Sequence, residues 1–350
     1  MKLVFADILL KVLVVIFFGN RAQAHGKFPA LFAFGDSILD TGNNNYLHTM
    51  IKSNFPPYGR DFPGGIPTGR FCNGKIPSDL IANALHIKET LPAYLNPNLK
   101  NEDLLTGVGF ASAGSGNDNL TATILGVLKL SEQLRLFKEY IGKLKEIVGE
   151  ERANNIISNS LCLLSAGNND IAVSHSMTAR KMHYAFPQYA AHLVGWSSDF
   201  LKDLYGLGVR RVAVLSTLPL GCLPGARTVG GLLRPCLVHV NKKAQLFNSM
   251  LSSKLDSMKN DVPDFKLTFV DVYTPLLHLV NNPEKSGFTN VLKGCCGTGT
   301  FELGVHCNQF TPHTCANASP YIFWDSGHPT QKAYELVVSN ILQTSGITSV

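Results

Sequence analysis

The chain has 350 residues, of which 45% are hydrophobic and 16% are charged, and its formal net charge is +6. A chain of this length can bury a large core, and this composition excludes extended disorder. The basic residues are scattered along the sequence, so no nucleic-acid partner is expected.

The first 24 residues have the pattern of a cleaved secretion signal. Lys2 precedes a mostly apolar stretch, and residues 22–24 (Ala-Gln-Ala) have the small-x-small form that signal peptidase accepts. Two charged residues interrupt the apolar stretch, which argues against a permanent membrane span. We therefore expect residues 1–24 to be a signal peptide and the mature chain to be extracellular, without a transmembrane segment.

The segment Phe32–Asn45, FAFGDSILDTGNNN, begins as a short buried strand and then changes to turn residues. Small and apolar residues at 30–33 predict the strand, and Gly35 lets the chain turn sharply at its end. Ser37 then lies just past a strand end, where catalytic groups are common. The alternative is that Ser37 caps a following helix, and this segment alone does not exclude it.

A long passage at 54–75 is rich in Gly, Pro and Asn and is too irregular for a helix or a strand. Long ordered loops of this kind usually carry function. We interpret this passage, and the loop around Gly230 and Gly231, as candidates for shaping a binding pocket.

Helices and strands alternate over the rest of the chain. Helical spacing is found at 77–87, 131–148, 150–158, 187–207, 237–258 and 330–343, and strand patterns at 160–167, 210–217 and 266–272. The strands are apolar and rich in β-branched residues, which is typical of strands buried on both faces. This alternation predicts an α/β layered domain with a mostly parallel sheet, and the absence of a linker or repeat predicts one domain over residues 25–350.

The chain has eight cysteines, and export would make them candidates for disulfides. Cys222 and Cys236 flank a Gly-rich loop and could close it. Four more lie close together near the C-terminus, namely Cys295, Cys296, Cys307 and Cys315. Zinc is the alternative for these four, but the lack of regular Cys-x-x-Cys spacing favours disulfides. Cys162 is expected to be a small core residue, and Cys72 has no evident partner.

Two asparagines lie in glycosylation sequons. Asn119 begins NLT, and Asn317 begins NAS, where a following proline makes modification less favourable. Modification of either residue would require it to lie on the surface.

Polar residues follow the predicted strands at positions where ligands bind in parallel-sheet proteins. Ser37 follows the first strand, and Asn169 follows the strand at 160–167. Near the C-terminus, Asp325 and His328 lie three residues apart. Each has an ordinary alternative, such as a helix cap for Asn169 or chance for Asp-x-x-His. Together they indicate chemistry, because one pocket of one sheet could collect a serine, a base and an orienting acid.

A serine hydroxyl is a poor nucleophile until a histidine accepts its proton and a carboxylate holds that histidine in the right tautomer. His328 and Asp325 could do this for Ser37 from one loop. Attack on an ester would place negative charge on the carbonyl oxygen, which needs hydrogen-bond donors aimed at it. The backbone N–H groups of Ser37 and of Gly114, in a glycine-rich segment, and the side-chain amide of Asn169 could supply them.

Four sequence blocks resemble the plant GDSL esterase/lipase family of the SGNH-hydrolase superfamily, in particular its extracellular-lipase branch. They are FGDSILDTGNNN, GVGFASAGSG, GNND and FWDSGHPT, in that order. The resemblance implies a three-layer α/β/α sandwich of SGNH or flavodoxin-like type. It also implies that Ser37 is the nucleophile, with Gly114 and Asn169 beside it in an oxyanion hole. Asp325 and His328 would complete a triad that needs no metal and no organic cofactor.

The implied activity is hydrolysis of carboxylic esters through an acyl-Ser37 intermediate. Its substrate would be a small-molecule or lipid ester, such as a lipid or an acylated compound of the plant surface or cell wall, and its location the cell wall, apoplast or a surface coat. No serine lies in Gly-x-Ser-x-Gly, which argues against an α/β-hydrolase nucleophile elbow. The alternatives are acyl transfer, hydrolysis of carbohydrate acetyl esters, and a non-catalytic lipid-binding or coat protein. Cys72 stands where the resemblance leads us to expect a serine.

Overall fold

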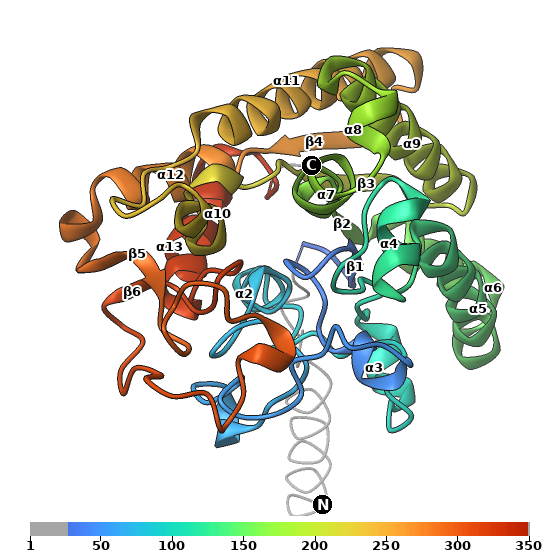
Figure 1. Ribbon diagram of the computed structural model, residues 1–350. Helices are drawn as coiled ribbons and strands as arrows, with labels where there is room; N and C mark the ends of the chain where they lie inside the picture. The colour runs from blue at the N-terminus through green and yellow to red at the C-terminus, as the bar shows by residue number, and fades with distance from the viewer. Residues whose placement is uncertain (1–26, 349–350) are drawn as a thin grey trace, which may run out of the picture.

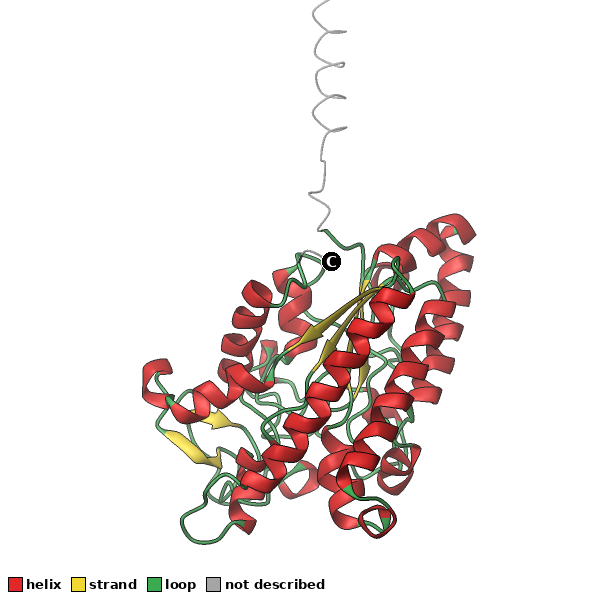
Figure 2. Ribbon diagram, turned by 90° about the horizontal axis from the view of Figure 1, so that it is seen from above, coloured by secondary structure: helices red, strands yellow, loops and turns green. Residues whose placement is uncertain are grey.

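A computed structural model describes residues 27–348, which contain a four-stranded parallel sheet with helices on both faces (Figures 1 and 2). The strands are β1 (Leu31–Gly35), β2 (Leu161–Ser165), β3 (Arg211–Leu215) and β4 (Lys266–Val270), adjacent in that order. Every residue of β1 and β2 is buried, as expected of strands covered on both faces. The predicted parallel sheet is confirmed, and the predicted signal peptide at residues 1–24 lies outside the described residues.

The helices that connect successive strands lie on one face of the sheet, because right-handed crossovers between sequentially ordered strands place them there. They are α5 (Leu130–Val148) with α6 (Glu150–Asn159), α9 (Phe186–Gly206) and α11 (Val238–Asp261). The other face is covered by α2 (Pro77–Ala84), α12 (Tyr273–Asn281) and α13 (Gln331–Thr344). Figure 2 shows the sheet between the two groups of helices. The predicted three-layer α/β/α architecture is therefore confirmed.

Shorter elements lie in the connections between these layers. They are α3 (Asn101–Leu105), α4 (Asn119–Leu125), α7 (His175–Met177), α8 (Arg180–His183) and α10 (Pro224–Val229). A second, two-stranded parallel sheet pairs β5 (Asn290–Gly294) with β6 (Tyr321–Phe323). The segment before Asp325 forms β6, so the prediction that one sheet carries all the site residues was wrong. The strand β5 is short, partly exposed and without a clear apolar pattern, and β6 is an apolar run of only three residues.

An aromatic cluster anchors β1 beneath the site. The ring of Phe34 stacks on that of Phe110 at 5.1 Å and meets that of Phe137, on α5, edge-on at 5.4 Å. Phe32 contacts Phe137 and Tyr140 in the same way at 5.3 and 5.2 Å. Aromatic pairs of this geometry add to the burial energy, so the end of β1 has a rigid base. Among the described helices, none is both long enough and apolar enough to cross a membrane.

Within residues 27–348 three disulfides form. They are Cys222–Cys236, Cys295–Cys315 and Cys296–Cys307. The first closes the Gly-rich loop as predicted. The other two exclude the zinc alternative for the C-terminal cysteines, because a sulfur in a disulfide has no thiolate to offer a metal. Cys72 and Cys162 are buried thiols that form no disulfide with any described residue.

Candidate active site

A continuous series of hydrogen bonds joins Ser37, His328 and Asp325. His328 Nε2 lies 2.8 Å from Ser37 Oγ, and His328 Nδ1 lies 2.9 and 3.0 Å from the two carboxylate oxygens of Asp325. Because the carboxylate can only accept, Nδ1 carries the proton and Nε2 is left to accept from the Ser37 hydroxyl. Asp325 is fully buried, whereas Ser37 is half-buried and open to a reactant.

The turn after β1 presents Ser37. Gly35 has a φ of 114°, and a Cβ at this position would lie 1.8 Å from the Ser165 carbonyl oxygen on β2. Only glycine therefore lets the end of β1 approach β2 so closely. The next helical element, η1 (Asn43–Tyr46), begins after Gly42 and has no side-chain cap, so the helix-cap alternative for Ser37 was wrong.

Asp36 ties this turn to the end of β2. Its carboxylate accepts hydrogen bonds from Asn168 Nδ2 and Ser165 Oγ, both at 2.9 Å, and from the Ile38 N–H at 3.1 Å. Burial raises the pKa of Asp36 above its usual value, and these three hydrogen bonds oppose the rise. Asp36 was not singled out from the sequence, although it directly precedes Ser37, because nothing local shows that its partners come from another strand.

The three predicted oxyanion donors lie in neighbouring segments. Gly114 has a φ of 89°, a conformation that suits glycine. Asn169 donates from Nδ2 to the Ser115 carbonyl at 2.9 Å, which orients the amide, and its other N–H group has no acceptor among residues 27–348. In the described part of the chain, no group accepts from the backbone N–H of Ser37 or of Gly114. All three groups are thus available as donors.

Gln133, on α5, connects the turn before Ser37 to the Gly114 segment. Its Nε2 donates to the Gly35 carbonyl at 2.9 Å and to Ser115 Oγ at 3.2 Å, while its Oε1 accepts from the Gly35 N–H at 2.8 Å. The side chain is fully buried. Gln133 was not predicted from the sequence, and the signal that could have found it is a polar residue on the buried face of an amphipathic helix.

Asp170 holds the other side of the Gly114 segment. Its carboxylate accepts from the N–H groups of Asn117 and Asp118 at 2.7 and 3.0 Å and from Thr121 Oγ1 at 2.6 Å. A Cβ on Gly116 would lie 2.3 Å from Asp170 Oδ1, so glycine is required there. Burial raises the pKa of Asp170 to about 6, although these hydrogen bonds oppose the rise.

The raised pKa of Asp170 makes the stability of the chain depend on pH. In the folded chain the pKa has moved from 3.8 to about 6, so the stabilising contribution of this group is complete below its ordinary pKa and is lost as the pH rises through about 6. Relative to an Asp170→Asn variant, we expect the free energy of unfolding of the native chain to fall by about 3 kcal/mol between about pH 4 and about pH 7. Urea unfolding at both pH values measures this, and a constant difference would contradict it.

The passage 54–75, predicted to carry function, contacts His328 and Asp325. The ring of Phe71 lies 5.1 Å from that of His328, and Tyr58 Oη lies 2.8 Å from Asp325 Oδ2. Both side chains are buried. The passage therefore forms part of the wall behind the triad.

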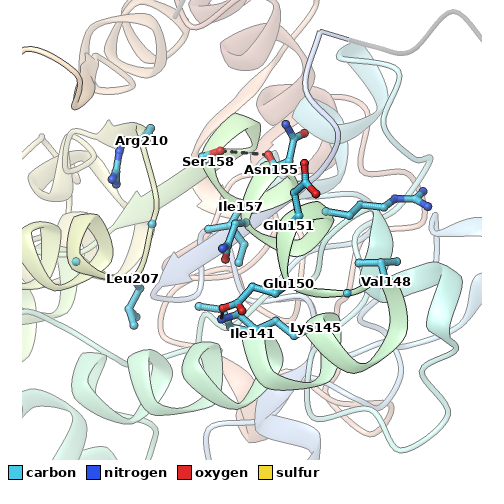
Figure 3. A pocket seen from close by; sticks show the side chains of 15 residues that line it. Ile141, Lys145, Val148, Glu150, Glu151, Asn155, Ile157, Ser158, Leu207 and Arg210 are labelled. Atoms are coloured by element: carbon cyan, nitrogen blue, oxygen red, sulfur yellow. Dashed lines mark hydrogen bonds and ion pairs between the residues drawn. The ribbon is translucent and has the colours of Figure 1, made fainter.

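A pocket of about 1080 Å³ lies elsewhere, between the α5–α6 junction and the connection from α9 to β3 (Figure 3). Lys145, Glu150 and Arg210 are among its lining residues. It opens where β3 begins, whereas Ser37 follows the end of β1. This pocket contains none of the residues predicted for the site.

The two sequon asparagines, Asn119 and Asn317, both lie on the surface. Asn119 is the first residue of α4. Their glycosylation stays a prediction.

The chain is similar to known proteins over most of its length. A family model described as GDSL-like Lipase/Acylhydrolase matches residues 31–341. GDSL esterase/lipase At5g42170 of Arabidopsis thaliana is 52% identical, over 90% of this chain and 85% of that protein. GDSL esterase/lipase EXL3 of the same plant is 49% identical, over 90% of this chain and 86% of that protein. The crystal structure of an extracellular lipase from Streptomyces rimosus is 15% identical, covers 89% of this chain and 99% of its own, and has a TM-score of 0.40. The chain belongs to the family of GDSL-like lipases and acylhydrolases.

Proposed function

We propose that the chain hydrolyses carboxylic esters, with Ser37 as the nucleophile. The observation that carries this proposal is the hydrogen-bonded line from Ser37 Oγ through His328 to the buried Asp325. His328 Nε2 takes the proton of Ser37 as the oxygen attacks the ester carbonyl, and gives it to the alcohol that leaves. The acyl group is then on Ser37. A water molecule, deprotonated by the same nitrogen, attacks it and releases the carboxylic acid.

The carbonyl oxygen becomes negatively charged in both steps. The N–H groups of Ser37 and Gly114 and the free N–H of Asn169 would bind it. Because the backbone and Ser115 already hold these donors in place, they need no reorganisation when the charge develops. One such donor is worth about 3 kcal/mol in the transition state.

We further propose that the ester is a lipid or another acylated compound. Five exposed apolar side chains lie in the segments that flank the catalytic loop, and these are Val229, Leu232, Leu233, Phe301 and Leu303. Backbone hydrogen bonds attach both segments to Ser326 in that loop. The Gly225 N–H donates to the Ser326 carbonyl, and the Ser326 N–H donates to the Glu302 carbonyl, both at 2.9 Å.

The two leucines at the tip of the first segment are the most exposed of this group, at 102% and 89% for Leu232 and Leu233. They lie in the loop that the Cys222–Cys236 disulfide closes. Removing a leucine side chain from water is worth about 1.5–3 kcal/mol, so contact with acyl chains would be favourable here. A group of exposed apolar side chains in segments attached to the catalytic loop therefore suits an aggregated lipid better than a small soluble ester.

Replacing Leu232 and Leu233 together by serine tests the lipid class of the substrate. Since partial burial of two leucines is worth about 1.4 kcal/mol or more, we expect hydrolysis of an emulsified long-chain nitrophenyl ester to fall about tenfold. Hydrolysis of nitrophenyl acetate should stay unchanged, because neither side chain touches the triad. Leu336→Ser, an exposed substitution on α13, is the control. An equal change for both esters, or no change for either, would contradict the lipid proposal.

The same apolar side chains favour a second function, a lipid-binding or coat protein without turnover. The two functions differ in one measurement. If the native chain hydrolyses neither nitrophenyl ester but binds a fluorescent lipid, the second function replaces the first. Acyl transfer to another alcohol would instead appear as a new ester product when that alcohol is added.

We propose an extracellular location, in the cell wall, the apoplast or a surface coat. Disulfides persist in oxidising compartments, and three of them form within the described residues. The exposed sequons at Asn119 and Asn317 are compatible with passage through the secretory pathway.

A further inference from the structure

Tyr58 lies behind the catalytic loop with its hydroxyl between two partners. The hydroxyl donates to Asp325 Oδ2 at 2.8 Å and accepts from the backbone N–H of Gly304, also at 2.8 Å. A phenol has one proton, and the Gly304 N–H occupies a lone pair of its oxygen. The proton of Tyr58 is therefore directed at the carboxylate.

The ring of Tyr58 is held by aromatic neighbours. It meets the rings of Phe55, Phe71 and Trp324 edge-on, at 6.0, 5.7 and 6.1 Å. The Arg60 guanidinium covers the Trp324 ring from 4.8 Å. Tyr58 is 1% exposed, so its hydroxyl has little freedom to leave the carboxylate.

The partner on the other side, Gly304, belongs to a segment that a disulfide braces. Three residues later Cys307 is joined to Cys296, and the Cys296 N–H donates to the Trp324 carbonyl at 2.8 Å. Trp324 directly precedes Asp325. The Gly304 donor and the catalytic loop are thus attached to the same rigid segment.

The two carboxylate oxygens of Asp325 accept hydrogen bonds from different numbers of donors. Oδ1 accepts from the N–H groups of Gly327 and His328, both at 2.8 Å, and from His328 Nδ1 at 2.9 Å. Oδ2 has His328 Nδ1 at 3.0 Å and Tyr58, and no further donor among the described residues. Without the Tyr58 hydroxyl, Oδ2 would be a buried anionic oxygen with a single, shared donor.

We propose that Tyr58 is a positioning residue for the triad, which fixes the orientation of the Asp325 carboxylate against His328. This inference rests on the proposed function and adds a residue to it. A hydrogen bond to an ionised carboxylate stabilises the charge and so weakens its attraction for the imidazolium of His328. Loss of this hydrogen bond would strengthen that attraction, so the pH dependence of hydrolysis reports whether the bond is present.

The donor stays protonated over the working pH range. Burial, and then the negative charge of Asp325, raise the pKa of Tyr58 well above its usual value. The hydroxyl therefore acts only as a donor to Asp325 and does not exchange its proton with the triad.

The Tyr58→Phe variant tests the proposal with nitrophenyl acetate as substrate. We expect kcat to fall about tenfold, because a charge-assisted hydrogen bond that orients the acid is lost, and KM to stay unchanged. The acidic limb of the kcat/KM profile should move to higher pH by about half a unit or more, because the more basic carboxylate holds the imidazolium more strongly. A merely structural tyrosine would not move this limb.

Tyr334→Phe is the matched control. It removes another buried tyrosine hydroxyl, for which the described chain provides no partner, so kcat and the pH profile should both stay native. An unchanged acidic limb in folded Tyr58→Phe would overturn the proposal.

A second variant tests the proposal if the Tyr58→Phe protein does not fold. Incorporation of 3,5-difluorotyrosine at position 58, by suppression of a stop codon, makes the hydroxyl a stronger donor. We expect it to move the acidic limb in the opposite direction, to lower pH, and a shift to higher pH would overturn the proposal. Failure of the proposed function would look different, because the native chain would then show no turnover.

Discussion

The Ser37→Ala variant is expected to lose hydrolysis of nitrophenyl acetate by a factor on the order of 10⁴ or more in kcat, because no other group can form the acyl intermediate. Among the described residues, the Ser37 hydroxyl has one hydrogen-bond partner, His328. Loss of this hydroxyl therefore removes the nucleophile without disturbing other hydrogen bonds of the described residues, and the unfolding temperature should stay close to that of the native chain. Steady-state kinetics and thermal unfolding on the same preparation measure both quantities.

A buried serine of no catalytic role provides the control for this loss. Ser53 is fully buried, and its hydroxyl has no partner in the described part of the chain, so Ser53→Ala should keep native turnover. A fluorophosphonate should label the native chain at Ser37 and leave Ser37→Ala unlabelled. Turnover by Ser37→Ala within tenfold of the native rate would rule out Ser37 as the nucleophile.

The largest loss of stability is expected for Asp79→Ala, on α2. The Asp79 carboxylate receives two hydrogen bonds of 2.7 Å from the Arg70 guanidinium, and the two side chains are 0% and 5% exposed. It also accepts from the N–H groups of Leu91 and Ile76. Removing it leaves a buried cation and two backbone donors unpaired, which should lower the free energy of unfolding by about 3–5 kcal/mol. Urea unfolding measures the difference.

An exposed ion pair provides the comparison for the buried pair of Asp79 and Arg70. Asp199 and Lys202 lie on α9, are 69% and 64% exposed, and approach to 3.1 Å. Because water solvates both groups, Asp199→Ala should change the free energy of unfolding by less than about 1 kcal/mol. If Asp79→Ala were as mild as Asp199→Ala, burial of the Arg70 pair would not contribute to stability as argued.

The strongly periodic elements could be predicted from the sequence because their signal is local. The helix predicted at 131–148 is observed as α5 at 130–148, and the strand predicted at 266–272 is β4 at 266–270. Each signal depends on which residues within one short segment are apolar. The strand β5 was not predicted because its residues carry no such pattern, and β6 has only three residues, too few for periodicity to define a strand.

Local signals also separate the site residues that could be predicted from those that could not. Ser37, Asp325 and His328 could be proposed because each lies in a short motif of reactive residues, and the structure brings them within hydrogen-bond distance. Gln133 and Tyr58 could not be proposed, because each acts on a segment 98 or 267 positions away. No local pattern marks a residue whose partner is that distant in sequence.

The sequence by itself determined the parallel α/β architecture and was enough to propose the reactive residues, since burial patterns, turn glycines and reactive motifs are properties of neighbouring residues. Only the tertiary structure decided the pairing of Cys295 with Cys315 and of Cys296 with Cys307, for which four cysteines allow three connectivities. It also decided that the Tyr58 hydroxyl donates a hydrogen bond to Asp325. The physical reason is that disulfides and buried hydrogen bonds depend on distances between remote segments, and packing of the whole chain sets those distances.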